Sequence, residues 1–96
     1  MDYRIKENSL VARIAAWKLN VKSVAVVIGH TIHLHNASKQ QFLNNKRWVR
    51  HELKHLEQFR KDGVLIFITK YLIESIKKGY WNNKYEIEAR AAEGQS

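Results

Sequence analysis

The chain has 96 residues, with 17 lysines and arginines against 9 aspartates and glutamates, and a formal net charge of +8. This length predicts a single domain, residues 1–96, with a small hydrophobic core. The chain has no cysteine, which excludes disulfides and cysteine-ligated metal centres, so only histidine, aspartate and glutamate could hold a metal ion.

The first half of the chain predicts a helix followed by a β-hairpin. Residues 9–19 carry apolar side chains at helical spacing, and Asn8 or Ser9 could cap the start of this helix. Residues 24–28 form a β-branched and apolar run, and residues 31–35 alternate between apolar and polar side chains. A glycine and a histidine separate the two runs, so we expect a tight turn between two antiparallel strands.

The second half of the chain predicts helices. Residues 36–45 are a polar connection with a short helical turn at 40–43. Helical periodicity, with glycines after two of the segments, then predicts three helices, over residues 46–61, 64–78 and 85–93. A loop over residues 80–84 precedes the last helix, with Asn82 or Asn83 as its cap. The predicted fold class is therefore α+β.

Apolar spacing also predicts which side chains form the core. The helix over residues 64–78 has a wide apolar face, so we expect it to supply most of the core. Trp17, Trp48 and Phe67 are expected to pack inside.

The helix predicted over residues 46–61 contains an H-E-x-x-H motif, His51-Glu52-Leu53-Lys54-His55. Residues four apart lie on one face of a helix, so both imidazoles could reach one ion while Glu52 lies beside it. Catalytic zinc takes three protein ligands and lowers the pKa of a bound water toward about 7. The motif therefore predicts Zn²⁺ held by His51 and His55, with Glu52 as general base. The alternative is a solvated helix face with two surface histidines.

A third ligand that follows the motif has to be a carboxylate, and three glutamates compete for the role. Glu74 lies 19 residues after His55, but lysines four residues before and after it favour an exposed ion pair. Glu86 and Glu88 lie near the start of the last predicted helix.

The segments HELKHLEQFRKDG and KKGYWNNKYEIEAR together resemble the gluzincin metallopeptidases. More narrowly, they resemble short bacterial zincin-like domains that carry an N-P-x-E-x-E-A segment. The resemblance covers about residues 20 to 92. It implies a minimal zincin-like fold and a zinc-dependent peptidase, with Glu86 as the third ligand and Glu74 and Glu88 as alternatives.

Two positions depart from the pattern of that family. Lys84 stands where the family has proline, which should only weaken helix initiation. Arg90 stands where the family has a residue that braces a ligand histidine. An arginine cannot accept a hydrogen bond from an imidazole N–H, so a backbone carbonyl or Glu88 would have to substitute.

The resemblance also suggests residues that contact substrate. Zincins lay an extended peptide against an edge strand, which implies that strand 31–35 binds substrate by β-augmentation. His33 and His35 share one face of that strand and could stabilise an oxyanion or bind a second metal, whereas a polar outer face is the alternative. Tyr80 or Tyr85 could supply an electrophilic phenol near the zinc, with packing as the alternative.

Three functions follow from these features. The first is a zinc metallopeptidase, acting on a peptide or protein substrate whose acidic character would suit the net charge. Its small size favours a protein partner or a homo-oligomer that completes the cleft. The second is a catalytically inactive zincin-like interaction domain. The third is a nucleic-acid-binding module, because six basic residues lie on or beside the helix that carries H-E-x-x-H. No recognised nucleic-acid-binding motif accompanies them. These are Lys46, Arg47, Arg50, Lys54, Arg60 and Lys61.

The N-terminal residues and the apolar segments indicate where in the cell the protein is expected. No signal-peptide core is present, and no segment approaches the roughly 20 apolar residues of a membrane span. We therefore expect a cytoplasmic protein without a membrane span.

Overall fold

The computed structural model describes residues 2–95. In chain order the elements are β1 (Arg4–Lys6), α1 (Leu10–Leu19), β2 (Val24–Ile28), β3 (Thr31–His35), α2 (Lys39–Asn44), α3 (Lys46–Asp62), α4 (Val64–Asn82) and α5 (Lys84–Glu93). The predicted α+β class is confirmed. Among the described residues, none of the helices has the length and apolar character that crossing a membrane requires.

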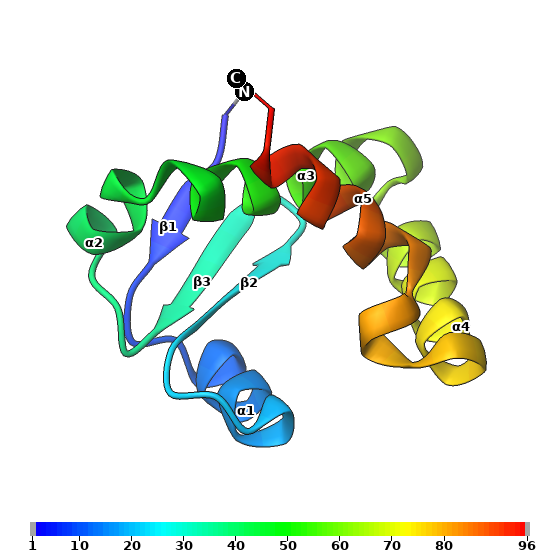
Figure 1. Ribbon diagram of the computed structural model, residues 1–96, viewed down its shortest axis with the longest axis horizontal. Coiled ribbons are helices and arrows are strands. Elements are labelled where there is room, and N and C mark those ends of the chain that lie inside the picture. The colour runs from blue at the N-terminus through cyan, green and yellow to red at the C-terminus, as the bar shows by residue number, and fades with distance from the viewer. Residues whose placement is uncertain (1, 96) are drawn as a thin grey trace.

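The three strands form one mixed sheet in the order β1-β3-β2 (Figure 1). The predicted hairpin is confirmed: β2 and β3 pair antiparallel, and Gly29 takes a φ of 63° in the turn, which tight hairpin turns require. Strand β1 was not predicted, because three residues with one apolar side chain carry no alternation signal. It pairs parallel to β3, so β3 is the central strand.

The core lies between one face of the sheet and helices α2, α3 and α4. Ile32 and Leu34 of β3 are fully buried there, and they point to the same face because they are two residues apart. Their partners in this cluster are Val27, Phe42, Leu56, Phe59 and Phe67. Phe67 is thus buried as predicted, and Trp48 is partly buried, edge-on to Phe42 with ring centroids 5.2 Å apart.

Helix α1 covers part of the opposite sheet face, and it does so with small side chains. Ala12 and Ala16 are buried, whereas Trp17 is 79% exposed. The prediction of a buried Trp17 is therefore wrong. Alanines allow a helix to approach a sheet closely, and α1 uses that side for packing while its larger apolar side chains face solvent.

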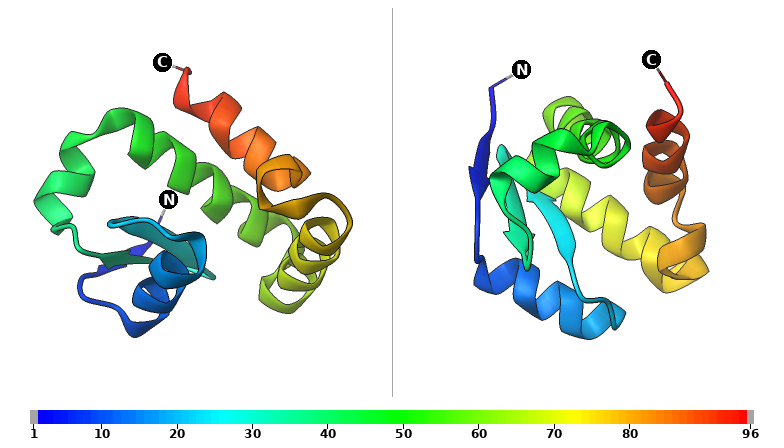
Figure 2. Two further views of the ribbon diagram at one scale, coloured as in Figure 1. Left: turned by 60° about the horizontal axis from the view of Figure 1, so that its bottom comes forward. Right: turned by 60° about the vertical axis from the view of Figure 1, so that its left-hand side comes forward.

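Helix α4 lies at the edge of the molecule (Figures 1 and 2), and it does not supply most of the core. Of its residues only Phe67 is buried, with Ile68 and Tyr71 packed partly against the core. Leu65 and Ile76 are 82% and 85% exposed. The predicted dominance of this helix in the core is therefore wrong.

The connection from α4 to α5 positions the C-terminal helix alongside α3 (Figure 1). Gly79 has a φ of 79° and a ψ of 167°, which interrupts α4 at the predicted end. The residues that follow make a further helical turn instead of the predicted loop. Asn83 then caps α5, and its buried side chain donates to the Tyr71 carbonyl and to Ser75 Oγ. These bonds fasten α5 to α4.

Candidate metal centre

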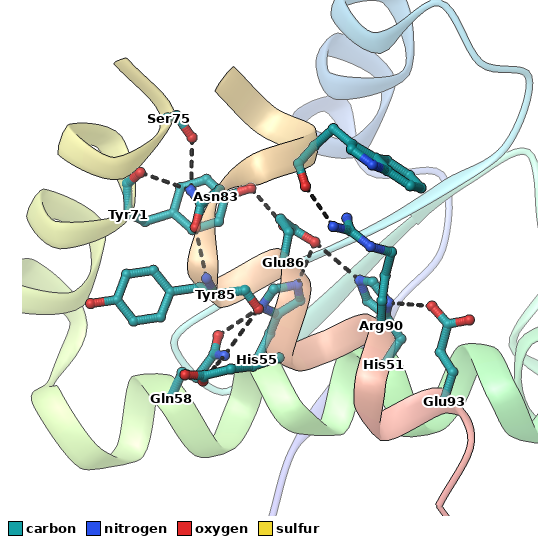
Figure 3. A network of polar contacts seen from close by, with 12 residues as sticks. His51, His55, Gln58, Tyr71, Ser75, Asn83, Tyr85, Glu86, Arg90 and Glu93 are labelled. Atoms are coloured by element: carbon teal, nitrogen blue, oxygen red, sulfur yellow. Dashed lines mark hydrogen bonds and ion pairs between the residues drawn. The ribbon is translucent and has the colours of Figure 1, made fainter. Parts of the chain in front are cut away.

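Three of the residues singled out from the sequence meet between α3 and α5 (Figure 3). The Nε2 atoms of His51 and His55 lie 3.2 Å and 3.1 Å from the same oxygen, Oε1 of Glu86. The two histidines are one helical turn apart on α3, and Glu86 reaches them from the first turn of α5. Their ligand atoms all lie within 4.8 Å of one another, so this group could hold a metal ion.

Each of these imidazoles is also held at its other nitrogen. His51 Nδ1 lies 2.7 Å from Glu93 Oε2, and His55 Nδ1 lies 2.9 Å from Gln58 Oε1. A carboxylate and an amide oxygen can only accept, so both Nδ1 atoms carry the proton and donate it. This pattern is the one that metal-ligating histidines show, in which the outer hydrogen bond sets the tautomer.

The orientation of the Gln58 amide is determined by its neighbours. Its nitrogen donates to the Tyr85 carbonyl at 3.1 Å and to Glu88 Oε1 at 3.0 Å, which leaves its oxygen for His55. Glu88 therefore contacts the residue that braces a histidine. The sequence left a backbone carbonyl or Glu88 as the brace, whereas in the structure Gln58 contacts His55 Nδ1 and Glu93 contacts His51 Nδ1.

This tautomer has a consequence for the centre of the cluster. With both Nδ1 atoms protonated, neutral imidazoles present the lone pairs of Nε2 to Glu86 Oε1, which is itself an acceptor. Such an arrangement is repulsive unless a cation lies among the three atoms, either as protons on the imidazoles or as a metal ion. The donor set of two nitrogens and one carboxylate oxygen fits a metal such as zinc.

The second oxygen of Glu86 is occupied. The Tyr71 hydroxyl donates to Glu86 Oε2 at 2.6 Å, which leaves Oε1 directed at the histidines. Burial, and then the Glu86 charge, raise the pKa of Tyr71 well above its usual range, so this phenol stays a donor. The sequence showed Tyr71 only as part of an apolar helix face, and no local signal connects it to Glu86.

The charges of the cluster are strongly coupled. Burial opposes ionisation of Glu86, but the hydrogen bonds from His51 and His55 outweigh it and hold the pKa of this carboxyl far below its usual range. Burial likewise disfavours the charged imidazoles, and Glu86 overcomes that effect and raises the pKa of both histidines. The metal-free cluster therefore retains protons that a metal ion would displace.

Glu52 lies beside the cluster and is 4% exposed. It lines a cleft of about 560 Å³ together with His51, the start of β2 and Tyr80. Burial, followed by the charges of Glu86 and Glu93, raises the pKa of Glu52 to about 8, although His55 acts in the opposite direction. The carboxyl group can therefore hold a proton near neutral pH at the wall of the cleft.

The two tyrosines considered from the sequence have different places. Tyr80 lines the cleft, and burial together with the charges of Glu86 and Glu52 raises its pKa. Tyr85 instead packs on Phe67, with ring centroids 4.9 Å apart, and belongs to the rim of the core. Arg90 lies over the Trp81 ring at 3.9 Å and donates to the Trp81 carbonyl, so it fastens the segment that carries Tyr80.

One further expectation about the site is corrected by the fold. Strand β3 is paired on both sides, so it has no free edge for a peptide; β2 is the edge strand beside the cleft. His33 and His35 point to the sheet face opposite the core, and His33 Nδ1 lies 2.8 Å from Ser9 Oγ.

Glu74 lies apart from the cluster, 3.3 Å from Lys78 in the ion pair expected from the sequence. Within residues 2–95, the group of possible metal ligands includes neither Glu74 nor Glu88.

Comparisons with protein-family models, with curated proteins and with solved structures give no significant match for this chain. Fold and site therefore define an α+β protein with a histidine–glutamate cluster, on two packed helices, that could hold a metal ion.

Proposed function

We propose that this chain is a zinc-dependent metallopeptidase with a minimal zincin-like fold. The observation that carries the proposal is the convergence of His51 Nε2, His55 Nε2 and Glu86 Oε1, with both Nδ1 atoms already bonded and Glu52 beside them in a cleft.

In this proposal His51, His55 and Glu86 hold the zinc. A zinc ion bound in such a site lowers the pKa of a water ligand toward about 7 and polarises a carbonyl group. Glu93 and Gln58 keep the two imidazoles in the required tautomer, and Tyr71 keeps Glu86 turned so that one oxygen faces the histidines.

Glu52 moves the proton in this mechanism. A zinc ion beside Glu52 would favour its ionised form, and this carboxylate would take a proton from the attacking water and return it to the amine nitrogen that leaves, as a general base and then a general acid. Tyr80, on the same cleft, donates its phenol proton in a hydrogen bond to the oxygen of the scissile carbonyl as negative charge develops there.

The substrate in this proposal is an extended peptide. The outer edge of β2 is unpaired among the described residues and adjoins the cleft, so a peptide could add to it as a further strand. The net charge of +8 favours acidic side chains in the substrate.

The test combines metal content with hydrolysis. We expect the purified protein to contain zinc by elemental analysis, His55→Ala to lose it, and Glu52→Gln to keep zinc while losing hydrolysis of unfolded protein substrates. Glu74→Gln is the matched control and should change neither. Zinc content that survives His55→Ala would refute the site, and hydrolysis that survives Glu52→Gln would refute the mechanism. Zinc without hydrolysis in the wild-type protein would instead favour an inactive interaction domain.

A further inference from the structure

Helix α4 exposes a largely apolar surface, in which the exposed Thr69 lies among large aliphatic side chains and bonds its hydroxyl to the Leu65 carbonyl. Leu65, Ile66, Leu72, Ile73 and Ile76 are between 48% and 85% exposed, and we call these five residues the α4 stripe. Their spacing places them on one helix face, since residues three, four and seven positions apart lie close together. The opposite face carries Phe67 and Tyr71 and contacts the core. The helix thus has one apolar face toward the core and a second apolar face toward solvent.

Exposure of this kind is unusual in a monomer. Contiguous apolar patches on soluble proteins rarely exceed a few hundred Å², and larger ones mark surfaces that another molecule covers. The α4 stripe gathers five exposed large aliphatic side chains in two adjoining helical rows. Nothing in the packing of residues 2–95 covers it.

Basic side chains border the stripe. Lys70 and Lys77 occupy the next helical row, and both side chains are exposed, although Lys70 is also 3.3 Å from Asp62. Trp81 follows the Gly79 kink and packs under the Arg90 guanidinium, so it does not belong to the stripe. The whole chain is also positively charged, with a net charge of +8. Residues 8–51 contain no acidic residue. Their basic residues are Arg13, Lys18, Lys22, Lys39, Lys46, Arg47 and Arg50.

We propose that the α4 stripe docks on the surface of an anionic lipid bilayer, with α4 lying in the plane of the membrane. An apolar face bordered by lysines is the pattern of helices that lie in the interfacial layer. The aliphatic side chains enter the boundary of the acyl chains, and Lys70 and Lys77 reach the negative head groups.

The shape of the surface favours a bilayer over a protein partner. A partner helix that binds in a groove finds none on this surface, because the described hollows beside β1, at Gly63 and at the candidate metal centre contain no residue of the α4 stripe. A second copy of the chain would bring two lysine-bordered faces of a +8 molecule together. A fluid, negatively charged surface accommodates an exposed helix ridge and complements its charge.

The experiment is co-sedimentation of the full chain with vesicles of phosphatidylcholine alone and with vesicles that also contain phosphatidylglycerol. We expect binding only to the anionic vesicles. The double variant Leu72→Ser/Ile76→Ser should lower the partition coefficient about tenfold or more, because each buried methylene contributes to membrane affinity. Both residues are exposed, so the variant should keep the wild-type circular dichroism spectrum.

The matched control is Leu10→Ser/Ile14→Ser, which removes two exposed aliphatic side chains from α1. It should bind as the wild type does. Equal loss in both double variants, or no loss in the α4 variant, would show adsorption through the basic surface and overturn the proposal. A wild-type dimer that the α4 variant converts to a monomer, measured by sedimentation equilibrium, would also overturn it in favour of a second copy.

Discussion

At the scale of single residues, the two histidines of the cluster differ in the group that accepts a hydrogen bond from their Nδ1 atoms. The Nδ1–H of His51 donates to a carboxylate, Glu93, whereas that of His55 donates to an amide, Gln58. A charged acceptor makes an imidazole more basic and a stronger metal ligand than a neutral acceptor does. Glu93 also accepts from Arg50 through its main-chain carbonyl, at 2.8 Å, which anchors the end of α5 to α3.

We therefore predict that Glu93→Ala weakens zinc binding about 10- to 100-fold, the range typical for outer-shell partners of ligand histidines. The physical reason is that His51 loses both its orienting acceptor and the charge that raises its basicity. Competition with a chromophoric chelator measures the affinity. Glu57→Ala is the control, because Glu57 is exposed and contacts only Lys54. Equal affinity in the two variants would show that Glu93 does not support a metal ligand.

At the scale of elements, the Gly79 kink decides where Tyr80 lies. A continuous α4 would carry residues 80–82 onward along its own axis, away from the cleft. Gly79 takes a φ of 79°, a region that side chains with a Cβ rarely adopt, and no atom lies within 4 Å of where a Cβ would be. The conformation, and not a lack of space, is what requires glycine here.

Gly79→Ala should therefore destabilise the protein by about 1 to 3 kcal/mol, the cost of holding a residue other than glycine in a sparsely populated backbone region. Urea unfolding followed by circular dichroism measures this difference. Gly94→Ala is the comparison, since Gly94 has a φ of −90° and an added Cβ would meet only one atom at 4.0 Å. If both substitutions cost the same, the strain argument fails.

The helices show how far periodicity predicts elements. Their positions in the sequence were predicted to within a few residues, because capping residues and 3.6-residue spacing are local signals. The side of each helix that is buried was not predicted correctly for α1 and α4. For α1 and α4, the most apolar side faces solvent, and the side that packs carries Ala12 and Ala16 in one case and Phe67 in the other. Periodicity identifies a stripe but not the element that covers it.

At the scale of the whole molecule, the candidate metal centre links two helices that the chain separates widely. His51 and His55 belong to α3, and Glu86 belongs to α5, about thirty residues later. Three basic side chains of α3 near the centre contact other groups of the chain. Arg47 lies near the Glu93 carboxylate, Arg50 donates to the Glu93 main-chain carbonyl, and Lys54 lies near Glu57. This engagement weakens the case for a nucleic-acid surface on α3.

The stability of the whole metal-free protein should depend on pH. His51, His55 and Glu52 all have a pKa raised in the folded state, to about 8 for Glu52. Their stabilising contribution is complete below the pKa of the unfolded chain and is lost as pH rises through the folded pKa. The free energy of unfolding should therefore fall as pH rises from about 4.5, the ordinary pKa of a glutamate, to about 8, the folded pKa of Glu52, and the histidines add to this fall above about pH 6.5. The lowered pKa of Glu86 acts with the opposite sign, but only in acid.

Zinc should offset this fall, because the ion takes the place of the protons and binds only the folded chain. Zinc at about a thousand times its dissociation constant would add about 4 kcal/mol. Chemical unfolding at several pH values, with zinc or with a chelator, measures both effects. His51→Ala/His55→Ala should show neither the zinc effect nor the histidine part of the pH dependence. Stability that is independent of zinc at pH 8 would contradict the proposed centre.

The sequence by itself determined the local geometry of this protein. It placed His51, Glu52 and His55 on one helix because residues three or four apart have a fixed relation there, and the family resemblance singled out Glu86 as their partner. Only the tertiary structure decided that Glu93, Gln58 and Tyr71 contact the candidate ligands, that β1 makes β3 a central strand, and that α1 and α4 turn apolar faces outward. These contacts join elements far apart in the chain, and their existence depends on how the elements pack, which residue spacing does not encode.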